Sequence, residues 1–102
     1  MKLIQTLSEQ IGDELSGARW YINLALETKT EHPTLAKTLY TISTQEMEHV
    51  KMLHDEVSDL IKEYRDEHGE PPSAMMAVYE YLHKKHIEKA ADVKNLQTMF
   101  KE

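Results

Sequence analysis

"STQEMEHVKML", residues 43–53, lies inside the longest helix that the sequence predicts. Apolar residues recur every three or four places on both sides of it, as expected for one face of a helix. Between them, the same periodicity falls on Glu46 and His49. A charged side chain in an apolar stripe is costly unless it is paired or bound to a metal ion. The stretch therefore predicts a packed helix with a polar site in its middle.

Composition limits the class of protein. The 102 residues suffice for one small domain, residues 1–102, with a single modest core. Twelve Lys and Arg against 18 Asp and Glu give a net charge of -6, which argues against nucleic-acid binding because phosphate contacts need clustered basic residues. There is no cysteine to form a disulfide and no apolar run of about 20 residues to span a membrane. We therefore expect a cytoplasmic protein with no membrane contact.

Three helices account for nearly the whole chain, over about residues 2–28, 33–68 and 72–100. Pro33 suits the first turn of a helix, and Gly69 with the two prolines that follow it ends the next one. Both connections are short, so consecutive helices should run antiparallel. The predicted fold class is all-α: a long helical hairpin plus a third helix.

An acid also interrupts the apolar stripe of the first helix. If the hairpin turn is centred near Glu31, Glu14 lies 17 places before the centre and the midpoint of Glu46 and His49 lies 16.5 places after it. The three side chains should therefore stand at one level and face each other. The predicted stripes are Leu7, Ile11, Glu14, Ala18, Tyr21 and Ala25 in the first helix, and Leu35, Leu39, Ile42, Glu46, His49 and Leu53 in the second.

A second Glu-x-x-His pair, Glu80 and His83, has the same spacing. With 6 His and 13 Glu in the chain, roughly one such match arises by chance. If the second and third helices run antiparallel about a turn near residues 70–71, this pair lies roughly 18 Å along the bundle axis from Glu46 and His49. We expect it to lie outside the first site. His83 and His86 are predicted on a solvated surface, and the remaining histidines in loops or on the surface: His32, His54 and His68.

Glu14, Glu46 and His49 together form a plausible metal-ligand set. Carboxylate oxygens and an imidazole nitrogen suit iron, with manganese or zinc as further candidates. One Glu and one Glu-x-x-His make half of a di-iron carboxylate site, which takes its ligands from four helices. A two-fold homodimer would complete a four-helix bundle with six protein ligands. We therefore expect a homodimer or a larger even-numbered oligomer.

Through "GDELSGARWY" and "QEMEHVKML", residues 11–60 resemble the ferritin-like superfamily, and most closely the encapsulated ferritins, whose short subunits each carry half a site. The resemblance implies that Glu14, Glu46 and His49 are metal ligands and that Tyr21 lies beside the metal. It also implies oxidation of Fe(II) by oxygen or peroxide, for iron storage or detoxification. The ending "QTMFKE" does not look like a shell-targeting peptide, so an encapsulating shell is not predicted.

Two other functions remain open at this stage. Glu14, Glu46 and His49 could form a buried hydrogen-bonded set that fixes the helix register of a metal-free interaction or assembly module. The second open function is that of a rubrerythrin-like peroxidase, although the chain has no cysteine to ligate a second iron centre. Without the resemblance, Tyr21 is more often a core aromatic than a redox residue.

Overall fold

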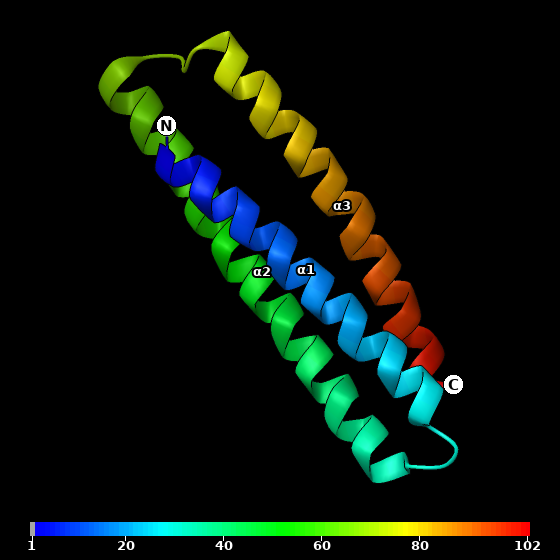
Figure 1. Ribbon diagram of the computed structural model, residues 1–102. Helices are drawn as coiled ribbons and strands as arrows, with labels where there is room; N and C mark the ends of the chain where they lie inside the picture. The colour runs from blue at the N-terminus through cyan, green and yellow to red at the C-terminus, as the bar shows by residue number, and fades with distance from the viewer. Residues whose placement is uncertain (1) are drawn as a thin grey trace.

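Three long helices and two short connections make up the structure, a computed structural model that describes residues 2–102 (Figure 1). The helices are α1 (Lys2–Thr28), α2 (Pro33–His68) and α3 (Ser73–Lys101). No strand occurs in this part of the chain, so the all-α prediction is confirmed. The helix bounds lie within one residue of the predicted ranges. The bundle is a rod with extents of 56 × 19 × 18 Å.

The helix ends follow from glycine and proline. Pro33 is the first residue of α2, where its missing N–H would have no helical partner. Gly69 has a φ of 79° and donates its N–H to the carbonyl of Arg65 at 2.9 Å, which closes the last turn of α2. Only glycine adopts this left-handed conformation without a steric cost. Pro71 and Pro72 then separate α2 from α3.

The first helix is central. α1 packs along α2 and also against α3, whereas α2 and α3 touch at few points (Figure 1). Two long sides of the bundle are therefore left open. One is the side of the α1–α2 hairpin that faces away from α3, and the other lies between α2 and α3.

One buried hydroxyl joins all three helices. Ser43 is fully buried and donates a hydrogen bond to the carbonyl of Ala18 at 2.8 Å. The Gln97 side-chain amide donates to the Ser43 hydroxyl at 3.0 Å, so this buried polar group is satisfied. The apolar core around it consists of Ile4, Ile11, Leu15, Ala18, Ile22, Ala25, Ala36, Leu39, Val57, Ile61 and Val93.

The predicted helix stripes are partly wrong. Ile11, Ala18, Ala25 and Leu39 are buried as expected, but Leu15, which the prediction left out, is buried as well. The small residues Ala18 and Ser43 meet directly and are fully buried, and the larger predicted residues are less buried. The stripe members that are only half-buried or exposed are Leu7, Tyr21, Leu35, Ile42 and Leu53.

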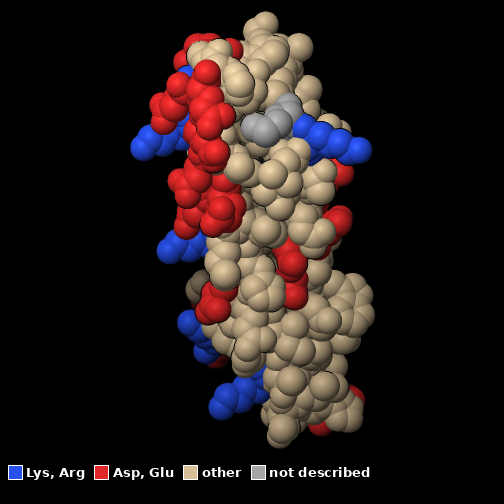
Figure 2. Space-filling view, turned by 90° about the vertical axis from the view of Figure 1, so that its left-hand side faces the viewer, with Lys and Arg blue, Asp and Glu red and all other residues tan. Residues whose placement is uncertain are grey.

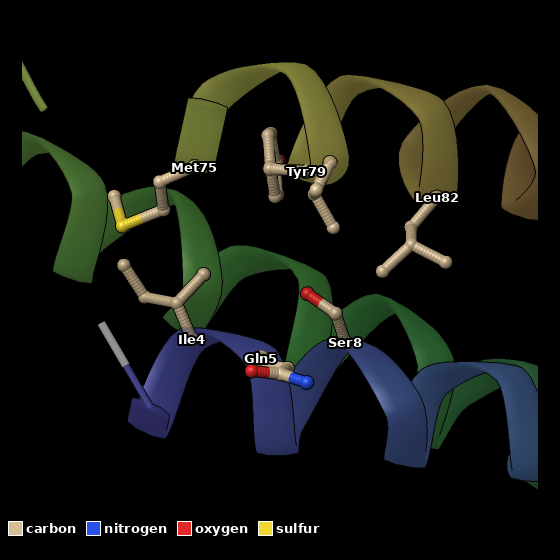
Figure 3. A pocket seen from close by; sticks show the side chains of 7 residues that line it. Ile4, Gln5, Ser8, Met75, Tyr79 and Leu82 are labelled. Carbon is tan, nitrogen blue, oxygen red and sulfur yellow. The ribbon is translucent and has the colours of Figure 1, made fainter. Parts of the chain in front are cut away.

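Packing is looser where α3 begins. A hollow of about 230 Å³ separates the first turns of α1 and α3. In Figure 3, Ser8 points from α1 towards α3, and Tyr79 and Leu82 line the opposite wall. The other end of α3 is better packed, because Val93 is fully buried there.

Candidate metal centre

Three potential metal ligands meet partway along the hairpin. The ligand atoms of Glu14, Glu46 and His49 all lie within 4.8 Å of one another. The Nδ1 atom of His49 is 3.6 Å from the Oε2 atom of Glu14. Two donors that each lie about 2.1 Å from one ion are separated by no more than about 4.2 Å. The His49–Glu14 pair already falls inside the span of one coordination shell.

Helix geometry explains how the three side chains come together. The spacing of three residues places Glu46 and His49 on one face of α2. Glu14 approaches from α1 at the level that reflection about the hairpin turn predicts. The sequence prediction of which residues meet therefore agrees with the structure.

Two neighbours on α1 position the carboxylates. The Gln10 amide donates to Glu14 Oε1 at 3.4 Å, one helical turn away. Gly17 lies one turn on the other side of Glu14, and a Cβ added there would stand 3.4 Å from Glu46 Oε2. A side chain at Gly17 would therefore be in close van der Waals contact with the Glu46 carboxylate.

The cluster sits at the margin of the hairpin interface and not within its core, which corrects the expectation of buried seam positions. The side chain of His49 is 52% exposed and that of Glu14 is 20% exposed. Gly12 faces His86 of α3. Glu14, two residues later, points about 200° away around the helix. The cluster therefore opens to the side of the hairpin that α3 leaves uncovered.

The two carboxyl groups shift each other's pKa in opposite directions. A hydrogen bond with Glu14 raises the pKa of Glu46, and partial burial and the Glu14 charge raise it further. The pKa of Glu14 is lowered by the hydrogen bond with Glu46, and Gln10 and His49 lower it as well. Carboxylates this close hold one proton between them more readily than two negative charges. A divalent cation would compete with that proton.

Tyr21 does not join the cluster. It follows Glu14 by two helical turns, about 10 Å along the axis. Its ring is half-buried and meets Trp20 edge-on, with centroids 5.1 Å apart. Its hydroxyl makes no hydrogen bond within residues 2–102. A role for Tyr21 beside a metal stays a prediction.

The surface prediction holds for Glu80 of the second pair but is wrong for His83 and His86. His83 is half-buried and stacks on His54, with centroids 5.0 Å apart, and on Tyr79, at 5.7 Å. His86 is also half-buried, because this side of α3 packs towards α1 and α2. Burial lowers the pKa of both His83 and His86. Glu80 is exposed, as are His32 and His68.

Comparison with known proteins gives no assignment. No protein-family model, curated protein or solved structure matches the chain. Among the described residues, no helix is both long enough and apolar enough to cross a membrane.

Proposed function

We propose that the chain is a subunit of a di-iron carboxylate protein that oxidises Fe(II), with two copies contributing to each site. The observation that supports it is the convergence of Glu14, Glu46 and His49 on an open side of the hairpin. The proposal agrees with the resemblance to encapsulated ferritins. Storage or detoxification of iron would be the purpose of such a reaction.

The donor set fits iron. Two carboxylates and one imidazole are ligands that iron, manganese and zinc accept, and oxygen donors favour iron or manganese over softer metals. One chain supplies three ligands, which leaves coordination positions for a second copy and for water. With the cluster at the margin of the interface, solvent and ions can reach it.

An apolar side supports the proposed pairing of two copies. Leu35 is 48% exposed and Leu3 is 51% exposed, although both are large and apolar. By helical spacing they lie on the same side of the hairpin as Glu14, Glu46 and His49. A two-fold dimer through this side would cover the apolar side chains and bring two half-sites together. Other apolar residues with this spacing are Leu7, Tyr21, Leu24, Ile42, Leu53 and Leu60.

The residues would act by binding and by exchanging a proton. Both carboxylates would bind a cation in their deprotonated form, and because the pKa of Glu46 is raised, acid should compete with the cation there. His49 would donate the Nδ1 lone pair as a neutral imidazole. The bound iron supplies the redox chemistry: each Fe(II) gives up one electron, and dioxygen or peroxide accepts the electrons.

Metal content and assembly test the proposal together. Wild-type protein should bind Fe(II), oxidise it in air and sediment as a dimer or larger even-numbered oligomer. The oligomer should be more stable with metal, because a ligand that binds only the assembled state adds mass-action stability. Glu14→Ala should lose the bound iron, whereas Glu9→Ala, which removes an exposed carboxylate from the same helix, should keep it. A monomer both with and without Fe(II) contradicts the shared site.

A metal-free helical interaction module is the second candidate. Its supporting observation is that Glu14, Glu46 and Gln10 already satisfy one another by hydrogen bonds without an ion. Protein that stays free of iron, manganese and zinc after exposure to each, yet dimerises through the same side, would favour this module. A rubrerythrin-like peroxidase would instead consume peroxide faster than dioxygen.

A further inference from the structure

A groove runs between α2 and α3, where these two helices hardly touch. Its volume is about 480 Å³. Small-molecule sites are typically about 300–1,000 Å³ and are lined mainly by apolar side chains with a few polar groups. The floor of this groove is apolar and is formed by Ile11, Met47, Val50 and Ala90, and the exposed Ile87 also lines the groove.

The polar groups are concentrated towards one end. α2 and α3 run antiparallel, so the stacked pair His54 and His83 places Lys51 level with His86. Thr44 and Lys94 mark the opposite end. The residues of α2 that line the groove span about 15 Å of helix. The groove thus has a basic, imidazole-rich end and a longer apolar body.

The groove carries positive charge in an acidic protein. Lys51 and Lys94 form no ion pair with any carboxylate in residues 2–102, and Glu48 is the one acid among the lining residues. Burial, the charge of Lys89 and the neighbouring imidazoles lower the pKa of His86. A neutral imidazole offers one N–H donor, and the ring nitrogens of His83 and His86 make no hydrogen bond with the described protein. Cations and free donors here have no protein anion to bind.

We propose that the groove binds a small amphipathic anion, with its carboxylate head at Lys51 and His86 and its apolar body along the floor. Charge complementarity favours this occupant: the lining holds two lysines and one acid, while the whole chain has a net charge of -6. The site is independent of the proposed iron centre, which lies on the side of the hairpin away from α3.

NMR titration of the metal-free full-length chain tests the proposal, with decanoate as the probe and decyltrimethylammonium as its cationic counterpart. Decanoate should shift resonances of residues 44–54 and 83–94. The cation should leave them unchanged. Equal binding of the two probes, or decanoate shifts confined to the open α1–α2 side, would overturn the proposal.

Charge reversal supplies the matched control. Lys51→Glu should weaken decanoate binding by about tenfold or more, because a like charge then opposes the head group. Lys62→Glu changes the net charge equally, uses an exposed lysine of the same helix outside the groove, and should leave binding unchanged. Ala90→Phe should also block binding by filling the floor. If decanoate instead dissociates an oligomer in sedimentation, the occupant is a second copy and the proposal fails.

Discussion

The two Glu-x-x-His pairs of this protein share a spacing and have different environments. Glu46 and His49 meet the carboxylate of Glu14 across the hairpin. His83 stacks instead on an imidazole and a phenol ring, and Glu80 points into solvent. The spacing places both members of a pair on one helix face, but the neighbouring helix decides which groups they meet. A short motif acquires chemical meaning only from what stands opposite it.

The strongest contrast should be in iron oxidation. Glu46→Ala removes one of the three proposed ligands and should reduce aerobic Fe(II) oxidation to near the uncatalysed rate, while the fold persists because only a partly buried carboxyl is lost. Glu80→Ala removes the corresponding residue of the other pair and should oxidise iron as the wild type does. Stopped-flow absorbance of the ferric product measures both. Equal rates in the two variants would show that the Glu46 site is wrongly assigned.

The two histidines should separate metal binding from stability. His49→Ala should weaken metal binding by more than about a hundredfold, since loss of even an outer partner of a ligand costs about 10–100-fold. His83→Ala should leave metal binding intact and lower the free energy of unfolding by about 1 kcal/mol through lost ring stacking. Isothermal titration and urea unfolding give the two quantities. A large stability loss in His49→Ala, whose side chain is 52% exposed, would contradict this division.

Acid should lower the stability that comes from the packing of His83 and His86. His83 and His86 have pKa values lowered from 6.5, so at pH values just below 6.5 the unfolded chain binds more protons than the folded one. The stability from these neutral rings is therefore complete above pH 6.5 and declines as the pH falls through the lowered values. In urea unfolding, His83→Gln with His86→Gln should flatten this decline. His32→Gln with His68→Gln, at exposed positions, should retain the full loss of stability in acid. If that loss persists in His83→Gln with His86→Gln, these two histidines are not its cause.

The smallest contrast concerns two glycines of α1. Gly17→Ala should weaken metal binding a few-fold, because its Cβ would stand 3.4 Å from Glu46 Oε2. Gly12→Ala meets His86 Nε2 at 3.5 Å and should leave metal binding unchanged. Both should raise the free energy of unfolding of the metal-free protein by about 0.5–1 kcal/mol, the helix-propensity gain of alanine over glycine. Equal metal affinities in the two variants would show that Gly17 does not position the carboxylate.

The fold and the meeting of Glu14, Glu46 and His49 could be predicted because both depend on local rules. Pro33 and Gly69 mark helix ends through their own backbone preferences. A short turn forces antiparallel pairing, and counting residues from that turn is enough to bring Glu14 level with Glu46 and His49. Neither step requires knowledge of side-chain packing.

The depth of each side chain could not be predicted in the same way. α1 has apolar residues on adjacent stripes, and periodicity does not show that Ala18 and Ser43 meet in the middle of the hairpin. Periodicity therefore predicts Glu14, Glu46 and His49 deeper in the helix interface than the structure has them. The surface prediction for His83 failed because the rotation of α3 about its own axis depends on contacts with α1 that lie far away in sequence.

The central place of α1 sets an order of events during synthesis. The contact between Ser43 and Ala18 closes a separation of 25 residues, whereas that between Arg19 and Asp92 closes one of 73. Loop closure costs more entropy as the intervening chain lengthens, so the hairpin forms before the last helix docks. We therefore expect Glu14, Glu46 and His49 to meet while the C-terminal third of the chain is still emerging from the ribosome. A nascent chain arrested before α3 should already hold all three residues of the proposed half-site together.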